Sequence, residues 1–126
     1  MKDETITYSN AGHPYPLLIR KDCNDWKMLK ANGYLIGMFN DTKYENYTEK
    51  IKKGEGILHF TDGLFENPQN SEENNSHTSV MEHAKLLQKT ALDNPDDFLD
   101  QLMDSFGKTD KNQIDDDIAI MYLIKK

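Results

Sequence analysis

Residues 54–66 read GEGILHFTDGLFE and join a short apolar run to an Asp-Gly pair. The apolar side chains of this run, fenced by glycines on both sides, predict a buried strand. Asp62 then stands where the strand leaves the core. A carboxylate at the rim of a sheet is suited to a hard cation, and Gly63 lets the backbone turn or approach a ligand closely. The alternative is that Asp62 only opens a turn, because Asp-Gly is a common turn pair.

A second acidic segment precedes the last apolar run, because residues 115–117 are all aspartate and lead directly into residues 118–124. The seven residues of that run carry no charge, and apolar side chains occur at both its odd-numbered and its even-numbered positions. The pattern predicts a strand covered on both faces, in the middle of a layered core. If it lies beside residues 56–60, Asp62 meets one of the three acids at one end of the sheet. Such a cluster requires a neutralising cation, and oxygen ligands favour magnesium, manganese or calcium.

The remaining patterns predict short strands and then two helices. Alternating or apolar segments indicate strands at residues 5–9, 17–20, 26–29 and 44–51, of which the first two form a hairpin-like unit. A capping-box spacing that begins at Ser79 predicts a helix over 79–92. Asn94 can cap the next helix, with Pro95 at its first position. The predicted fold class is α+β, a mainly antiparallel sheet with two consecutive helices packed on one face.

Composition restricts the partners and the compartment. The 126 residues suffice for one domain with a modest core. A formal net charge of -7 argues against nucleic acid as a partner, because binding a polyanion requires a basic face. Cys23 is the only cysteine, which excludes an internal disulfide and favours a reducing cytoplasm. No run approaches the roughly 20 apolar residues that span a bilayer, so we expect no membrane partner for this segment.

Three motifs occur in a fixed order along the chain. They are YSNAGHP at residues 8–14, TDGLFE at residues 61–66 and DDIA at residues 116–119. Each alone is modest, but the ordered set is specific and covers nearly the whole chain. It resembles the SpoIIE/RsbU-like branch of the metal-dependent (PPM) serine/threonine protein phosphatases. Glu55 stands where that family usually has Asp, and Ala119 where Thr is frequent, so the departures spare the expected ligands.

This resemblance implies a fold, a metal centre and a reaction. The fold is half of a PPM-like β-sandwich, and the implied metal ligands are Asp62 and Asp116. Gly63, Asp117 and His13 are possible neighbours of the site; Asp117 is the second choice of ligand, and His13 can equally be a solvated turn histidine. The complete domain holds two ions, manganese or magnesium. It hydrolyses phosphoserine or phosphothreonine on a regulatory protein, of the anti-anti-sigma type in bacterial signalling, with no Ser, Cys or His nucleophile.

The resemblance begins in the middle of the family's domain, so we expect residues 1–126 to be its C-terminal part. The earlier half carries further metal ligands, and the chain alone is therefore expected to be inactive. One alternative is a non-catalytic half-domain that acts as a protein-interaction module. A weaker alternative treats the acidic clusters as solvated turns of a structural protein. Without the other half, the strand at 118–124 either exposes an apolar face or self-associates, so a homodimer is one expected assembly.

Overall fold

The computed structural model describes residues 4–65, 77–108 and 117–126, and the expected ligand Asp116 lies outside these ranges. Within them the chain forms six strands, three α-helices and two short 3-10 turns. The strands are β1 (Thr5–Tyr8), β2 (Leu17–Ile19), β3 (Lys27–Met28), β4 (Tyr47–Lys50), β5 (Gly56–Phe60) and β6 (Ile120–Ile124). The helices are α1 (His77–Leu86), α2 (Gln88–Asp93) and α3 (Pro95–Ser105), and the 3-10 turns are η1 (Cys23–Asp25) and η2 (Asp62–Leu64).

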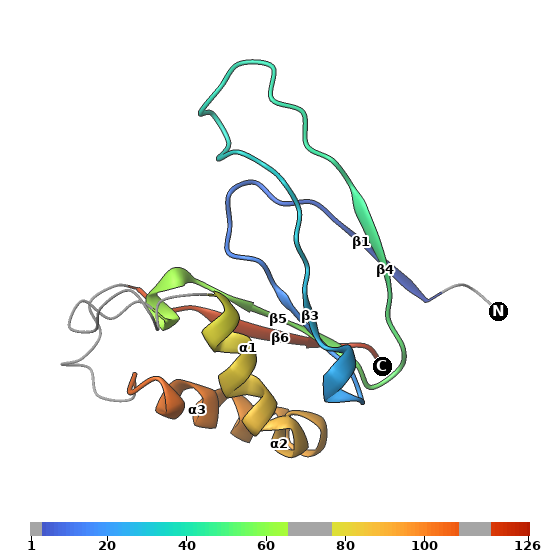
Figure 1. Cartoon of the computed structure of the whole chain (residues 1–126), viewed down its shortest axis with the longest axis vertical. Helices are drawn as coiled ribbons and strands as arrows, with labels where there is room; N and C mark the ends of the chain where they lie inside the picture. The colour runs from blue at the N-terminus through green and yellow to red at the C-terminus, as the bar shows by residue number, and fades with distance from the viewer. Residues whose placement is uncertain (1–3, 66–76, 109–116) are drawn as a thin grey trace.

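The strands form two antiparallel sheets (Figure 1). The larger has the order β3-β2-β5-β6, with Phe60 of β5 opposite Ile120 of β6. The smaller contains β1 and β4, with Tyr8 opposite Tyr47 and their rings stacked at 5.8 Å. The predicted hairpin between the first two strands is therefore wrong. The loop after β1 carries the chain from one sheet to the other, so β1 and β2, although consecutive in sequence, do not pair.

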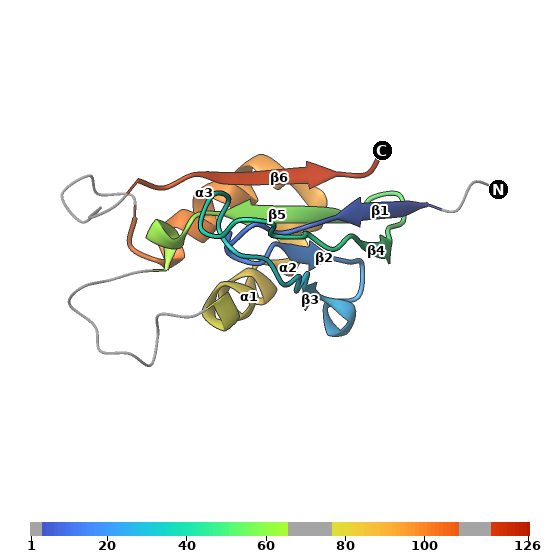
Figure 2. The same ribbon diagram turned by 90° about the horizontal axis from the view of Figure 1, so that it is seen from above.

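The helices cover one face of the larger sheet, and the β1–β4 ribbon rises from the other face (Figures 1 and 2). Between sheet and helices lies the main core, which includes Leu17, Leu58, Phe60, Val80, Phe98 and Leu102, all at most 2% exposed. A smaller core on the opposite face contains Leu18, Leu29, Ile51 and Ile57, against which Ile6 and Tyr8 pack. The predicted α+β fold, with antiparallel strands and helices on one face, is confirmed.

The helical region differs from the prediction in two respects, the first of which is that α1 begins at His77, before Ser79. The helix predicted over 79–92 divides at Leu87, whose N–H bonds to the Ala84 carbonyl at 3.0 Å in a tighter turn. This break turns the chain so that Ala91 of α2 also enters the core. Helix α3 begins as predicted, with Pro95 at its first position and the Asn94 side chain accepting from the Asp97 N–H at 3.4 Å. None of the helices in the described part of the chain is long and apolar enough to cross a bilayer.

The last strand is not in the middle of a layered core, contrary to the prediction from its sequence. Strand β6 lies at the edge of the larger sheet. Its even-numbered side chains Ile120 and Tyr122 pack on the helices, and the Tyr122 ring contacts Phe98 edge-on at 5.6 Å. Its odd-numbered side chains Met121 and Leu123 are each 50% exposed. The helices supply one cover, and no described element supplies the other.

Candidate functional site

Asp62 lies directly after the central strand β5, at the start of η2. The turn is closed by two backbone hydrogen bonds, from the Leu64 N–H to the Thr61 carbonyl and from the Phe65 N–H to the Asp62 carbonyl, both 3.1 Å. The Gly63 N–H donates to the Asp62 carboxylate at 3.0 Å. Gly63 and Leu64 are buried, whereas Asp62 is exposed. The buried residues therefore fix the backbone while the carboxylate stays open to a ligand.

Thr61 joins this turn to the segment that leads into β6. Its backbone N–H donates to the Ala119 carbonyl at 3.0 Å, and its hydroxyl accepts from the Ala119 N–H at 2.9 Å. The same hydroxyl donates to the Asp117 carbonyl at 3.2 Å. Three hydrogen bonds thus hold exposed Asp117 beside the strand end that carries Asp62. The two acidic motifs meet at one end of the sheet, and Asp116 itself lies outside the described residues.

The loop after β1 faces Asp62 and is closed by Asn10. The side-chain amide of Asn10 donates to the His13 carbonyl, and its oxygen accepts from the His13 N–H, both at 2.8 Å. Gly12 between them has a φ of 81°, a left-handed conformation that favours glycine. The loop also needs a glycine opposite it, because a Cβ on Gly33 would lie 1.7 Å from the Asn10 carbonyl oxygen. The exposed His13 ring donates from Nδ1 to the Pro14 carbonyl at 3.0 Å, which leaves Nε2 for another partner.

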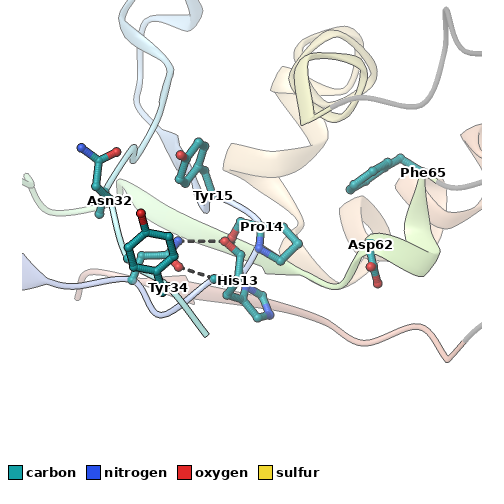
Figure 3. Close-up of a pocket in the computed structure, with 11 residues that line it drawn as sticks. His13, Pro14, Tyr15, Asn32, Tyr34, Asp62 and Phe65 are labelled. Atoms are coloured by element: carbon teal, nitrogen blue, oxygen red, sulfur yellow. Dashed lines mark hydrogen bonds between the residues drawn. The ribbon is translucent and has the colours of Figure 1, made fainter. Parts of the chain in front are cut away.

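An open hollow of about 780 Å³ separates this loop from Asp62 (Figure 3). Its wall combines polar side chains with the aromatic rings of Tyr15, Tyr34 and Phe65. The described lining residues are Asn10, Gly12, His13, Pro14, Tyr15, Ala31, Asn32, Gly33, Tyr34, Asp62 and Phe65. None of them is Lys or Arg. An anion in the hollow would therefore need its charge balanced by something other than these side chains, and a cation bound at Asp62 would supply that charge.

His59 is half-buried on the face of β5 away from the helices, where it lines a second hollow of about 380 Å³ together with His13, Thr61 and Met121. Partial burial lowers the pKa of His59 below its usual value of 6.5, and the charge of nearby His13 lowers it further. The imidazoles of His59 and His13 therefore both lie near the end of β5. Both are nitrogen donors, whereas Asp62 offers the oxygen that hard cations prefer.

Glu55 lies at the opposite end of β5 from Asp62 and has a structural role. Its side chain is 5% exposed, and it accepts from Arg20 at 3.2 Å and from the Lys52 N–H at 2.8 Å. Arg20 also donates to the Lys50 carbonyl at 3.0 Å, so the pair ties β5 to the end of β4. These contacts satisfy a buried carboxylate without a metal ion.

The structure brings Asp62 and His13 to one hollow and Asp117 to the same end of the sheet, with Gly63 in the supporting turn. Among the described residues, no group of three or more His, Cys, Asp or Glu side chains is arranged to hold a metal ion. Asp62 supplies the kind of donor that manganese and magnesium prefer, but further ligands are required. Sequence reasoning gave Thr61 and Asn10 no role beyond their places in the quoted motifs, although Asn side chains often close turns by bonding to nearby backbone groups.

Comparison with known proteins gives a consistent family match. The family described as Stage II sporulation protein E (SpoIIE) matches residues 1–124. Phosphoserine phosphatase RsbU of Bacillus subtilis is 25% identical over 126 residues, which are 100% of this chain and 36% of that protein. The chain also superposes on the PP2C phosphatase domain of SpoIIE from B. subtilis, solved with a fragment of its regulatory domain. That structure has a TM-score of 0.73 and 22% identity, with coverage of 98% of this chain and 34% of the other.

Two further structures of the same fold were solved with divalent metals. A manganese-presoaked phosphatase domain of SpoIIE from B. subtilis has a TM-score of 0.68 and 22% identity, and the match covers 98% of this chain and 52% of that one. RsbX in complex with magnesium has a TM-score of 0.56 and 21% identity, and the match covers 98% of this chain and 51% of that one. The chain thus spans about a third of the RsbU protein and about half of the isolated phosphatase domain.

Proposed function

Because this chain belongs to the SpoIIE family, we propose that residues 1–126 form the C-terminal part of a metal-dependent serine/threonine phosphatase domain and contribute carboxylates to its metal centre. The observation that carries the proposal is the set of hydrogen bonds from Thr61, which brings the segment of Asp117 to the strand end that carries Asp62. The pairing of β5 with β6 brings together two acidic motifs that lie more than 50 residues apart in sequence, and a cation bound there would balance their charge.

Each residue of the site has a distinct task in this proposal. Two manganese or magnesium ions, when bound, would lower the pKa of an attacking water and balance the charge of the phosphate. Asp62 would hold an ion, and its carboxylate is already oriented by the Gly63 N–H at 3.0 Å. Asp116 is the second proposed ligand and Asp117 the alternative. The remaining ligands would come from residues outside the described part of the chain.

The hollow beside Asp62 suits a phosphorylated side chain on a protein. It is open, so a segment of another protein can enter, and the aromatic rings of Tyr15, Tyr34 and Phe65 offer apolar contacts to the residues that flank the phosphate. The Nε2 atom of His13 is free of the contact to Pro14 and, because Nδ1 carries the proton, can accept a hydrogen bond from a donor on the substrate segment. We place the substrate among the phosphorylated regulatory proteins of bacterial signalling and the reaction in the cytoplasm. The net charge of -7 gives no support to nucleic acid as a partner.

Manganese titration tests the metal centre directly. An ion that binds only the folded chain must raise the melting temperature by mass action. We expect a small rise for the isolated chain, which Asp62→Asn removes. We further expect the isolated chain to hydrolyse para-nitrophenyl phosphate hardly above background even at millimolar manganese, and joining it to the first half of a family domain to raise turnover by orders of magnitude. Strong manganese-dependent turnover by the isolated chain would contradict the requirement for further ligands. Failure of Asp62→Asn to change the manganese response would contradict the site itself.

A second candidate function is that of a non-catalytic interaction module, and one observation favours it. The loop between β3 and β4 exposes a series of large apolar side chains beside the hollow: Tyr34 (62%), Leu35 (54%), Ile36 (83%), Met38 (57%) and Phe39 (56%). Exposed apolar groups in such a concentration mark contact surfaces. Activity after completion of the domain separates the two candidates, because an interaction module would gain no turnover.

A further inference from the structure

Asn32 and Tyr34 form the end of the hollow that lies opposite Asp62. In Figure 3 their side chains and that of Tyr15 lie at one end, and Asp62 and Phe65 lie at the other. A ligand that reaches both ends must therefore be longer than one phosphorylated side chain. The volume of the hollow, about 780 Å³, is within the range of clefts that hold a ligand of that size.

The backbone of this segment is fixed by contacts on both sides of Gly33. A Cβ on Gly33 would lie 1.7 Å from the Asn10 carbonyl oxygen, so this residue packs tightly against the loop after β1. The Tyr34 carbonyl accepts from the Tyr44 hydroxyl at 3.1 Å. The Tyr34 ring also meets the Phe39 ring edge-on, with centroids 4.9 Å apart. A segment that is held in place before a ligand arrives loses less conformational entropy on binding.

The polar ends of the Asn32 and Tyr34 side chains are available to a ligand. Asn32 is exposed, and its carboxamide makes no hydrogen bond to the described part of the chain. Tyr34 is 62% exposed, and within the same residues only its backbone carbonyl is hydrogen-bonded, which leaves the hydroxyl free. Both side chains line the hollow, so a bound ligand would meet a carboxamide and a phenol hydroxyl at this end.

These two groups are complementary to a peptide main chain. A carboxamide offers an N–H donor and a carbonyl acceptor, and a peptide group offers the matching acceptor and donor. The Tyr34 hydroxyl can donate to a further carbonyl. None of the described lining residues is Lys or Arg, so a carboxylate or a second phosphate at this end would find no opposite charge. The Tyr15 ring offers an apolar surface to a side chain of the same ligand.

We propose that Asn32 and Tyr34 bind the main chain of the substrate protein, a few residues away from its phosphorylated side chain. The Asn32 carboxamide pairs with one peptide group and the Tyr34 hydroxyl donates to a neighbouring carbonyl. This inference rests on the proposed function, which places the phosphorylated residue at Asp62. The contact makes the hollow selective for an extended segment of protein, because a small phosphate ester at Asp62 does not reach the other end. Main-chain hydrogen bonds give affinity that depends little on the flanking side chains.

Nuclear magnetic resonance of the isotope-labelled chain tests the contact through the side-chain NH2 signals of Asn32, which Asn32→Ala identifies by their loss. Three ligands are compared in millimolar magnesium: an alanine- and glycine-rich peptide with one central phosphoserine, the same peptide with serine, and free phosphoserine. We expect both peptides to shift the Asn32 signals, the phosphopeptide at lower concentration. Free phosphoserine should leave them unchanged. Asp62→Asn should remove the advantage of the phosphopeptide and retain the response to the serine peptide.

Matched variants measure the contribution of each group. Asn32→Ala and Tyr34→Phe should each weaken phosphopeptide binding on the order of 5- to 10-fold, as expected for the loss of one or two hydrogen bonds. Asn40→Ala is the control, because Asn40 is exposed on the same loop and does not line the hollow. Methylation of successive peptide nitrogens in the ligand should weaken binding at one or two positions, and this effect should disappear in Asn32→Ala.

The outcomes separate this inference from the proposed function. Magnesium-dependent phosphopeptide binding at Asp62 with unchanged Asn32 signals would overturn the main-chain contact and leave the proposed function intact. Equal binding of the two peptides, without an effect of magnesium, would contradict the proposed function and support the contact. The contact would also be overturned if neither peptide binds at millimolar concentration, if free phosphoserine or adenosine monophosphate shifts the Asn32 signals as strongly as the phosphopeptide, or if Asn40→Ala weakens binding as much as Asn32→Ala.

Discussion

The hydroxyl of Thr61 accepts a hydrogen bond from the backbone N–H of Ala119 at 2.9 Å, and this contact joins the two strands that carry the acidic motifs. The same oxygen donates to the Asp117 carbonyl at 3.2 Å. A hydroxyl that donates and accepts at once holds both neighbours, and it adds to the β5–β6 pairing and to the bond from the Thr61 N–H to the Ala119 carbonyl. The metal centre proposed for Asp62 therefore rests on Thr61 as a positioning residue.

Replacing that hydroxyl should weaken both the fold and metal binding. Thr61→Val keeps the shape but leaves the Ala119 N–H without its partner, so we expect the free energy of unfolding to fall by about 1–2 kcal/mol. The rise in melting temperature on adding manganese should also become smaller. Urea unfolding and a manganese titration measure the two effects. Thr48→Val, which loses only an exposed 3.4 Å contact with Thr7, is the control and should change neither quantity.

The two ends of β5 should respond differently to loss of a charge. Asp62→Asn should leave the free energy of unfolding without metal nearly unchanged, because the side chain is exposed, and should abolish the response to manganese. Glu55→Gln should do the reverse, since it disrupts a buried pair with Arg20 at 3.2 Å and should cost about 1–3 kcal/mol. In a completed domain, Asp62→Asn and Asp116→Asn should each abolish turnover. Near-normal turnover of either variant at saturating manganese would remove that residue from the ligand set.

Gly56 should not tolerate a side chain. A Cβ at this position would lie 2.4 Å from Cε2 of Tyr122 and 2.6 Å from the Leu123 carbonyl oxygen. The backbone oxygen cannot move without breaking the β5–β6 pairing, so Gly56→Ala should lower the free energy of unfolding by roughly 2–3 kcal/mol. Gly37→Ala is a useful comparison, because no atom lies within 4 Å and only the φ of 82° opposes it. Thermal or urea unfolding should show the larger loss at position 56.

His59 should make the chain less stable in mild acid. Burial and then the charge of His13 lower the pKa of folded His59 below its value of 6.5 in the unfolded chain. As pH falls below 6.5, the unfolded chain takes up a proton at this residue more readily than the folded chain. The free energy of unfolding therefore decreases from pH 6.5 down through the folded pKa.

Melting temperatures across this range test the assignment. His59→Gln should remove that part of the decrease, and His13→Gln should remove a smaller part, because His13 is the lesser cause. An unchanged acid dependence in His59→Gln would show that another group is responsible.

Tyr122 should resist ionisation until strongly alkaline pH. Burial against the helices raises its pKa from 10.0 to about 12. The unfolded chain releases this proton first, so the stabilisation present below pH 10 is lost as pH rises toward 12. Ultraviolet titration of the parent chain and Tyr122→Phe should assign the late-titrating tyrosine to this position. A Tyr122→Phe variant that retains the late transition would contradict the assignment.

Local patterns in the sequence were sufficient to locate the strands and the start of α3, but not the bounds of every element. The apolar run before Asp62 forms β5, and the Asn94-Pro95 pair starts α3, because capping and hydrophobic periodicity act within a few residues. The sequence pattern also predicted that the two acidic strand ends would meet, on the condition that the two strands are neighbours in the sheet. Thr61, which holds them together, carried no comparable signal, since a threonine at a strand end is ordinary.

The sequence alone determined the α+β class, the position of the carboxylates at strand ends and the family motifs. Only the tertiary structure decided that β1 pairs with β4, that the predicted helix breaks at Leu87, and that β6 lies at an edge with one apolar face exposed. The physical reason is the range of the interactions. Capping and periodicity depend on neighbours in the chain, whereas the choice of a strand's partner depends on which distant surface buries the most apolar area. A strand sequence that is apolar on both faces predicts that other elements pack on both faces, but it does not specify which segments these are.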